Sequence, residues 1–302
     1  MVFVAVNDRT LARDMWPDGK GRLAQDLSTK DDLPLHRVVP QTYEELCGWL
    51  CVDSCGADSV STVWIHPDIV GEEERVELTL RLQGFVKEVS VGTLGSWNGT
   101  ILGAPKAVQS LTLTSGRCHD AFDPQLAAVD NIRQLVLKLL SRPGVNNGQQ
   151  DGCIRLSRRV FERVRPGDDP DSAIRVPLAD DPEGRAKKIQ NMWAIRHRID
   201  GGVQGPNARL DRCNPRVIKP GDFVDVAVTV QAVSIRQPRG RRAIDVMFEP
   251  QAIIRLLKSD ESLALLQAIQ EEEEATGPIE DVVVVRRDVG FAFSADDEEM
   301  PE

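Results

Sequence analysis

Alternating apolar and polar residues predict β structure in the first half of the chain. Between residues 76 and 82 an apolar side chain stands at every second position, which is the period of a strand buried on one face. These apolar residues are Val76, Leu78, Leu80 and Leu82. Further strands are expected at 60–66, 85–92 and 107–114, with a glycine-containing turn at 95–103.

The strongest β pattern lies in the second half, after the turn residues Lys219-Pro220-Gly221-Asp222. Valine occupies positions 224, 226, 228 and 230 and so falls on one face of a strand. After Ala232 the apolar residues move to odd positions, which predicts a bulge or bend. A turn at 237–240 leads to a second strand at 244–249. We therefore expect a long, bent hairpin whose tip carries Arg236, Arg239, Arg241 and Arg242.

Three stretches have the signals of helices. At 42–52, Thr42 is the expected N-cap and Glu45 completes a capping box. A longer amphipathic helix is expected at 124–141, with Asp123 as its cap and Pro124 at its first position. Its apolar stripe consists of Leu126, Val129, Ile132, Val136 and Leu139. A last helix is expected at 260–274, followed by a short strand at 281–287.

Together these elements predict an α+β fold that is mostly antiparallel β structure. The stretch 143–152 is rich in glycine and asparagine and is the expected boundary between two modules. Residues 1–145 would form a β-rich N-terminal module, and residues 153–288 a basic module with an OB-like barrel and added helices in the C-terminal half. Strands on either side of the boundary could also pair, so that both halves share one core. Residues 289–302 are expected to be a disordered acidic tail.

Charge is distributed unevenly along the chain. The net charge is −10, and residues 271–302 account for all of it, with twelve acidic and two basic side chains. The segment 185–242 carries thirteen Lys and Arg against four Asp and Glu, a net charge of +9. The total charge argues against a polyanionic partner, but this basic segment points to one.

The basic segment is the candidate site for single-stranded nucleic acid. Cations spread along a groove hold phosphates, and flat apolar side chains stack on bases. The expected phosphate-binding residues are Arg196, Arg198, Arg209, Arg212, Arg216, Lys219, Arg236, Arg239, Arg241 and Arg242. Trp193 and Phe223 are the stacking candidates, with a place in the core as the alternative for each. For the cations, the alternative is a solvated face balanced by acidic side chains.

The acidic tail is expected to occupy the cationic groove until nucleic acid displaces it. The same tail would recruit partner proteins once it is free. The residues expected to do this are Phe291, Phe293, Asp296, Asp297, Glu298 and Glu299. A purely solubilising tail is the alternative.

Three motifs resemble the phage-type single-stranded DNA-binding proteins. They are Asp211-Arg212-Cys213-Asn214-Pro215, Gly221-Asp222-Phe223-Val224-Asp225-Val226, and the tail from Phe291 to Glu299. The resemblance covers residues 205–302. It implies an OB fold, a role in replication, recombination or repair, and a tail that contacts replication proteins and competes with DNA. The chain ends in Met300-Pro301-Glu302, where the family has an aromatic residue.

Other interpretations of the chemistry stay open. No enzyme is expected, because the sequence lacks phosphate-binding, dinucleotide-binding and nucleophile-elbow motifs. A metal-dependent nuclease is one alternative, and its ligands would be Asp222, Asp225, Asp245 and Glu249, although we expect the last three to be solvated on the hairpin. A coat or scaffold protein is another. On a helix, Cys47, Cys51 and Cys55 would share one face, but buried thiols are expected rather than a metal site. No metal or cofactor is expected.

We expect the chain to act inside the cell, in the cytoplasm or nucleus. Residues 1–6 are too short for a secretory signal, and the sequence has no apolar stretch that could span a membrane. The six cysteines are then expected to be free thiols. The expected partners are single-stranded DNA or RNA, replication or recombination proteins at the tail, and further copies of the chain.

Overall fold

A computed structural model describes residues 1–23, 25, 26, 28–53, 60–71, 75–141, 144, 152–169, 172–205, 209–236 and 242–276. The chain divides into two compact units, Met1–Leu266 and Gln267–Glu302. Helix α5 (Ser259–Thr276) begins in the first unit and ends in the second, which agrees with the expected helix at 260–274. The hairpin tip at 237–241, the expected strand at 281–287 and the tail at 289–302 lie outside the described residues.

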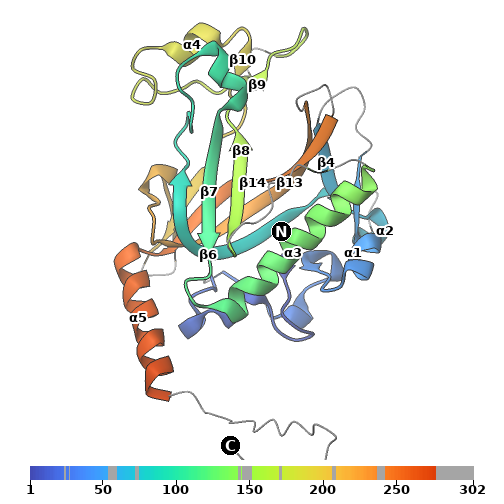
Figure 1. Cartoon of the computed structure of the whole chain (residues 1–302), viewed down its shortest axis with the longest axis vertical. Coiled ribbons are helices and arrows are strands. Elements are labelled where there is room, and N and C mark those ends of the chain that lie inside the picture. The colour runs from blue at the N-terminus through green and yellow to red at the C-terminus, as the bar shows by residue number, and fades with distance from the viewer. Residues whose placement is uncertain are drawn as a thin grey trace, which may run out of the picture. The chain divides into compact units, whose positions relative to one another are not determined.

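A ten-stranded sheet forms the centre of the first unit, and most of its strand pairs are antiparallel (Figure 1). The main path runs β12-β11-β14-β13-β6-β7-β8, and β4 pairs with β13, β3 and β5. The strands are β3 (Leu50–Val52), β4 (Val60–Ile65), β5 (Val76–Glu77), β6 (Thr79–Ser90), β7 (Val108–Thr114), β8 (Ile154–Arg159), β11 (Asp200–Gln204), β12 (Leu210–Cys213), β13 (Phe223–Arg236) and β14 (Arg242–Leu257). The expected α+β class with mainly antiparallel strands is thus confirmed.

Smaller elements surround this sheet. Strand β1 (Phe3–Val4) pairs in parallel with β2 (Val38–Val39), and β9 (Glu162–Arg163) pairs antiparallel with β10 (Trp193–Ala194). The other helices are α1 (Tyr43–Trp49), α2 (Pro67–Val70), α3 (His119–Leu139) and α4 (Arg185–Ile189). Short 3-10 turns are η1 (Ala12–Met15), η2 (Pro17–Gly19), η3 (Lys30–Asp32), η4 (Leu35–Arg37), η5 (Ile101–Lys106) and η7 (Pro215–Val217). None of the helices in the described part of the chain combines the length and apolarity needed to cross a lipid bilayer.

The long hairpin of β13 and β14 is confirmed, but both faces of β13 are buried. Val224, Val226, Val228 and Val230 have no exposed surface, and on the opposite face Asp225 and Thr229 are buried as well. The register shifts fall between Phe223 and Val224 and between Ala227 and Val228, so the bulge expected after Ala232 is wrong in its position. From Gln231 to Val233 the strand pairs with β4 instead of β6. Ala232 and Val233 stand on opposite faces and are both buried, and this two-sided burial explains the change of phase in the sequence.

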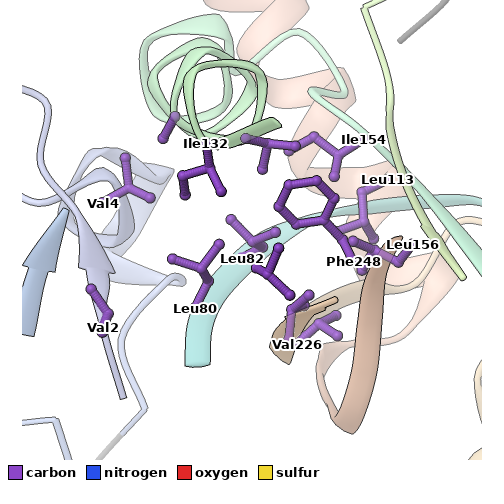
Figure 2. Close-up of a cluster of buried hydrophobic side chains, with 14 of the residues drawn as sticks. Val2, Val4, Leu80, Leu82, Leu113, Ile132, Ile154, Leu156, Val226 and Phe248 are labelled. Carbon is purple, nitrogen blue, oxygen red and sulfur yellow. The ribbon is translucent and has the colours of Figure 1, made fainter. Parts of the chain in front are cut away.

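Helix α3 packs against the sheet over the larger of the apolar cores. Figure 2 shows Ile132 of α3 facing Leu82 of β6, with Leu113, Ile154, Leu156 and Phe248 contributed by β7, β8 and β14. The helix begins at His119, so Pro124 lies inside it and Asp123 is not its cap. Ala121 and Phe122 have no exposed surface, and their burial favours a helical first turn despite the hydrogen bond that the proline cannot donate.

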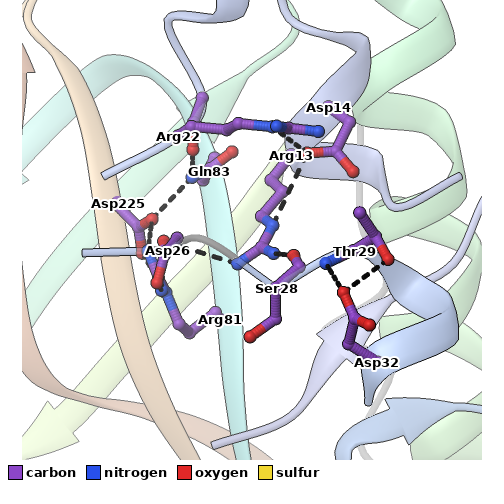
Figure 3. A network of polar contacts seen from close by, with 11 residues as sticks. Arg13, Asp14, Arg22, Asp26, Ser28, Thr29, Asp32, Arg81, Gln83 and Asp225 are labelled. Atoms are coloured by element: carbon purple, nitrogen blue, oxygen red, sulfur yellow. Dashed lines mark hydrogen bonds and ion pairs between the residues drawn. The ribbon is translucent and has the colours of Figure 1, made fainter. Parts of the chain in front are cut away.

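A buried network of charged side chains joins the N-terminal segment to the sheet (Figure 3). Arg81 on β6 donates from Nε to Asp225 on β13 at 3.0 Å and from Nη1 to Asp26 at 2.7 Å. Arg13 lies 3.5 Å from Asp26 and also donates to the Ser28 carbonyl. Burial alone would lower the pKa of Arg81, but the carboxylates of Asp225 and Asp26 raise it above its usual value. The first residues of the chain are thus held against the sheet by ion pairs.

A second, smaller core joins the loop between β6 and β7 to the segment that follows β8. Its buried residues are Ala104, Ala107, Val160, Phe161, Ala186, Ile189 and Ile195. Trp97 from the loop packs edge-on against Phe161, with ring centroids 5.0 Å apart. This core fixes η5 and α4 beside each other at one end of β7 and β8 (Figure 1).

Strands from both sides of the expected boundary at 143–152 pair in the central sheet. Strand β6 pairs with β13 from Phe85 opposite Phe223 to Thr79 opposite Thr229. Residues from both halves belong to one apolar core. The OB-like barrel expected in the C-terminal half is not confirmed, because the sheet places β13 beside β6, which precedes the boundary. The described strands also form no closed barrel, since no backbone ladder joins β8 to β14.

Candidate nucleic-acid interface

Trp193 and Arg196 line one open groove of about 850 Å³ beside the second core. Phe161, Ile174 and Val176 supply apolar surface to this groove, and Trp193 is half-buried against the same core. The Arg196 guanidinium lies 2.7 Å from Asp168 through Nη2 and 3.5 Å from Glu162 through Nε. The hydrogen bond from His197, together with Arg196, lowers the pKa of Glu162. The charge of Arg196 is therefore already neutralised. This agrees with the alternative in which acidic side chains balance the cations of the basic segment.

Two exposed cations in the same groove have no carboxylate partner among the described residues. They are Arg175 and Lys187, which were not among the expected site residues. Lys187 belongs to α4, and Asp181 caps that helix by accepting from the backbone nitrogens of Arg185 and Ala186 at 2.8 and 2.7 Å. The groove thus combines an indole face with cations, which are the groups that a nucleotide needs.

Arg198 and Arg212 line a separate pocket of about 250 Å³ together with Asp180 and Asp200. Arg212 lies 3.3 Å from Asp200. Beside the pocket, Arg216 lies 2.7 Å from Asp180, which also accepts a hydrogen bond from Thr93. A Cβ atom at Gly92 would stand 3.2 Å from Nε of Arg216, so the glycine lets this guanidinium pack on the backbone. Most of this cationic surface is therefore paired.

The remaining expected residues do not join these two sites. Arg209 is exposed and lies 3.5 Å from Asp211, while Lys219 is exposed in the turn before β13. Phe223 is only 1% exposed and packs against Trp16 at 4.7 Å and Phe85 at 5.0 Å, so it is a core residue and cannot stack on a base. The side chains of Arg236, Arg239, Arg241 and Arg242 and the tail residues Phe291, Phe293, Asp296, Asp297, Glu298 and Glu299 lie outside the described residues.

The outer face of β7 and β8 carries cations that the sequence reasoning missed. Ile154 and Leu156 point into the core, so Arg155, Ser157 and Arg159 stand on the opposite face. In register, Thr112 lies opposite Arg155 and Ser110 opposite Ser157. Arg155 and Arg159 are exposed and have no ion-pair partner among the residues that the structure describes. The alternation Ile-Arg-Leu-Ser-Arg at 154–158 is a strand signal that could have found them.

The carboxylates of the nuclease alternative do not gather around a common point. Asp225 and Glu249 are buried in ion pairs with Arg81 and Arg158, so the expectation that they face solvent is wrong. Burial raises the pKa of Glu249, and Arg158 opposes that shift. Asp222 accepts from the Lys219 backbone nitrogen at 2.9 Å. Each of these three carboxylates is held by its own partner.

The cysteines also give no metal centre within the described residues. Cys47 lies on α1 and is exposed, whereas Cys51 lies on β3 and is half-buried. They do not share a helix face, because α1 ends at Trp49, where the chain turns into a strand, and Cys55 lies outside the described residues. The expectation of a buried thiol is wrong for Cys47. No group of three or more His, Cys, Asp or Glu side chains suited to a metal ion occurs in the described part of the chain.

Comparison with models of protein families gives no match to this chain, and a search of curated protein sequences gives none either. Its site is therefore interpreted from its own geometry.

Proposed function

We propose that this chain binds single-stranded nucleic acid on an OB-like barrel formed by β6, β7, β8, β13 and β14. The observation that carries the proposal is the strand order. Strands β6, β7 and β8 lie side by side in chain order, and β13 returns after a long connection to pair with β6. A fourth strand placed beside the first is the Greek-key arrangement. An OB fold is a five-stranded, partly open Greek-key barrel, and β14 supplies the fifth strand.

Side-chain contacts between β8 and β14 support a barrel with an open seam. Arg158 on β8 donates from Nη1 to Gln251 at 2.8 Å and lies 3.8 Å from Glu249. Leu156 of β8 and Phe248 of β14 belong to one core (Figure 2). A seam at which β8 and β14 are joined by side chains and not by a backbone ladder fits a partly open barrel.

The proposed ligand face is the outer surface of β7 and β8. OB folds bind oligonucleotides on their second and third strands, between the loop that joins the first two strands and the loop that joins the last two. In this chain those loops are 91–107 and the arginine-containing 237–241. Arg155 and Arg159 would hold phosphates on the face, and the groove with Trp193 would stack a base just past the end of β8.

A double variant tests this face. Arg155→Gln with Arg159→Gln should weaken binding of a fluorescently labelled single-stranded oligonucleotide, measured by anisotropy at several salt concentrations. The slope of log affinity against log salt should fall by about 1 for each arginine–phosphate pair that the substitutions remove. Arg9→Gln is the matched control, because Arg9 is an exposed arginine in the N-terminal segment and should leave both quantities unchanged.

Two results would contradict the proposal. One is a wild-type protein that shows no salt-dependent affinity for the single strand, or that prefers duplex added as competitor. The other is a double variant with the affinity and slope of the wild type, which would remove β7 and β8 from the interface.

The resemblance to phage-type single-stranded DNA-binding proteins supports the same function. On that basis we propose a role in replication, recombination or repair, with DNA as the ligand. The acidic tail would compete with the ligand in cis and present Phe291 and Phe293 to partner proteins when it is displaced.

A further inference from the structure

The loop between β6 and β7 presents two adjacent large aliphatic side chains to solvent. Ile101 is 51% exposed and Leu102 is 85% exposed, the highest value for a large apolar side chain in the described part of the chain. Scattered apolar residues on a surface need no explanation, but a neighbouring pair held out on a structured loop often marks an interaction site.

Hydrogen bonds hold this loop in one conformation. Trp97 Nε1 donates to the Thr100 carbonyl at 2.8 Å, and Thr100 Oγ1 accepts from the Gly103 backbone nitrogen at 3.0 Å. A Cβ atom at Gly103 would stand 2.0 Å from Oδ1 of Asn98, so only glycine fits this close approach. Ala104 anchors the turn in the second core at 1% exposure. The fold therefore keeps the side chains of Ile101 and Leu102 exposed to solvent.

Three lysines lie on the two elements that share the second core. Lys106 ends η5, and Lys187 and Lys188 lie in α4, which shares the second core with η5. A Cβ atom at Gly99 would stand 2.5 Å from Nη1 of Arg185, so the side chain of this first residue of α4 reaches the loop, where it also pairs with Glu183 at 2.7 Å. All three lysines are exposed, and none has a carboxylate partner among the described residues. The exposed apolar pair and the three lysines therefore lie on neighbouring elements.

We infer that Ile101 and Leu102 insert next to an unpaired base while Lys106, Lys187 and Lys188 hold the flanking phosphates. The inference rests on the proposed function, because this loop is the one that would frame the β7–β8 face. Nucleic-acid-binding proteins use apolar wedges of this kind to unstack neighbouring bases. An anionic membrane surface would also attract such a tip. A nucleic acid fits better, because the unpaired arginines of the β7–β8 face would continue the same phosphate track.

The test uses a single-stranded oligonucleotide that contains one 2-aminopurine, whose fluorescence rises when it loses its stacking neighbours. Binding of the wild-type full chain should raise the fluorescence, and Leu102→Ser with Ile101→Ser should abolish the rise and weaken affinity about tenfold without changing the salt slope. Lys106→Gln should instead lower the slope of log affinity against log salt, because it removes a phosphate contact. Leu35→Ser is the matched control, because Leu35 is 78% exposed on η4. This substitution should leave the fluorescence rise, the affinity and the salt slope unchanged.

The outcomes separate this inference from the function on which it rests. If the wild type binds no single strand, the proposed function itself fails. If the wild type binds and the double serine variant keeps both affinity and fluorescence change, the function stands and the wedge is excluded. Loss of binding to phosphatidylserine vesicles in that variant, with unchanged oligonucleotide affinity, would assign the tip to membranes. Circular dichroism checks that each variant is folded.

Discussion

Asp225 and Asp211 differ greatly in burial, although both stand on strands and both contact an arginine. Asp225 is 3% exposed and accepts hydrogen bonds from Arg81 and Gln83. Asp211 is exposed and lies 3.5 Å from Arg209. Removing one partner of a buried pair leaves an uncompensated charge in a medium that solvates it poorly, whereas an exposed partner is solvated by water.

Asp225→Ala should therefore lower the free energy of unfolding by about 3 kcal/mol or more, since it leaves Arg81 with Asp26 alone. Asp211→Ala should change it by about 0.5 kcal/mol or less. Urea denaturation monitored by circular dichroism measures both values. Equal effects of the two substitutions would show that the network in Figure 3 contributes nothing beyond an ordinary surface pair.

The sequence predicted that the candidate site contains cations, but it did not predict which carboxylates lie beside them. A net excess of cations in 185–242 is visible without a structure, but the partners of Arg196 and Arg216 are not, because Asp168 and Asp180 precede that segment. Arg155 was not predicted, because it lies outside the basic segment 185–242. Its charge stands out only when the residues on one face of β8 are compared. The sequence left two places open for Phe223, and its packing against Trp16 and Phe85, both distant in sequence, shows that it is buried.

Local signals predicted elements well where the determining contacts are close in sequence. The capping box of Thr42 and Glu45 is present, with the Glu45 nitrogen 3.3 Å from Thr42 Oγ1. Helix α1 nevertheless ends before residue 52, because Leu50 to Val52 pair with β4. In α3 the expected stripe holds for Val129, Ile132 and Val136, but Leu139 is 47% exposed. Tertiary pairing thus overrides local preference at element ends.

The buried pair of Arg158 on β8 and Glu249 on β14 should make stability depend on pH. Arg158→Met should leave Glu249 buried without its cation, which raises the pKa of that carboxyl further above its ordinary value of 4.5. A folded state that keeps a proton which the unfolded state has released loses stability as the pH rises. The variant should therefore be less stable than the wild type by about 3 kcal/mol near pH 7, and the difference should shrink toward about pH 4.

Thermal or urea unfolding across that pH range measures the difference. The double variant Arg158→Met with Glu249→Gln is the control, since it removes the buried charge and should recover most of the stability at neutral pH. A pH-independent destabilisation in the single variant would mean that the Arg158 stem, packed between the strands, matters and its charge does not.

The central sheet could not be predicted from either half of the sequence alone, because its strands come from both halves. Pairing of β13 with β6 joins residues 223–229 to 79–85, and periodicity carries no information about such distant partners. The glycine-rich stretch at 143–152 looked like a domain boundary because turn residues mark loops within a domain as readily as linkers between domains. The Greek-key order, on which the proposed function rests, appears only once these long-range pairs are known.

The acidic residues that give the chain its net charge lie in its last segment. Residues 1–270 carry no net charge, so the whole net charge of −10 resides in residues 271–302. A polyanion tethered to the proposed phosphate-binding face competes with nucleic acid at a high effective concentration. Deleting residues 290–302 removes five carboxylate side chains and should raise affinity for a single-stranded oligonucleotide. The gain should be largest at low salt, because salt screens the tail and the ligand alike.

Anisotropy titrations of the full and shortened chains at low and high salt provide the measurement. Phe291→Ser with Phe293→Ser is the informative control, since it preserves every carboxylate and should leave affinity unchanged while abolishing binding of any protein that recognises the tail's aromatic residues. Equal affinities of the full and shortened chains at low salt would contradict competition in cis. The cationic face would then bind its ligand without regulation, and the acidic residues would serve solubility, as polyanionic tails also do.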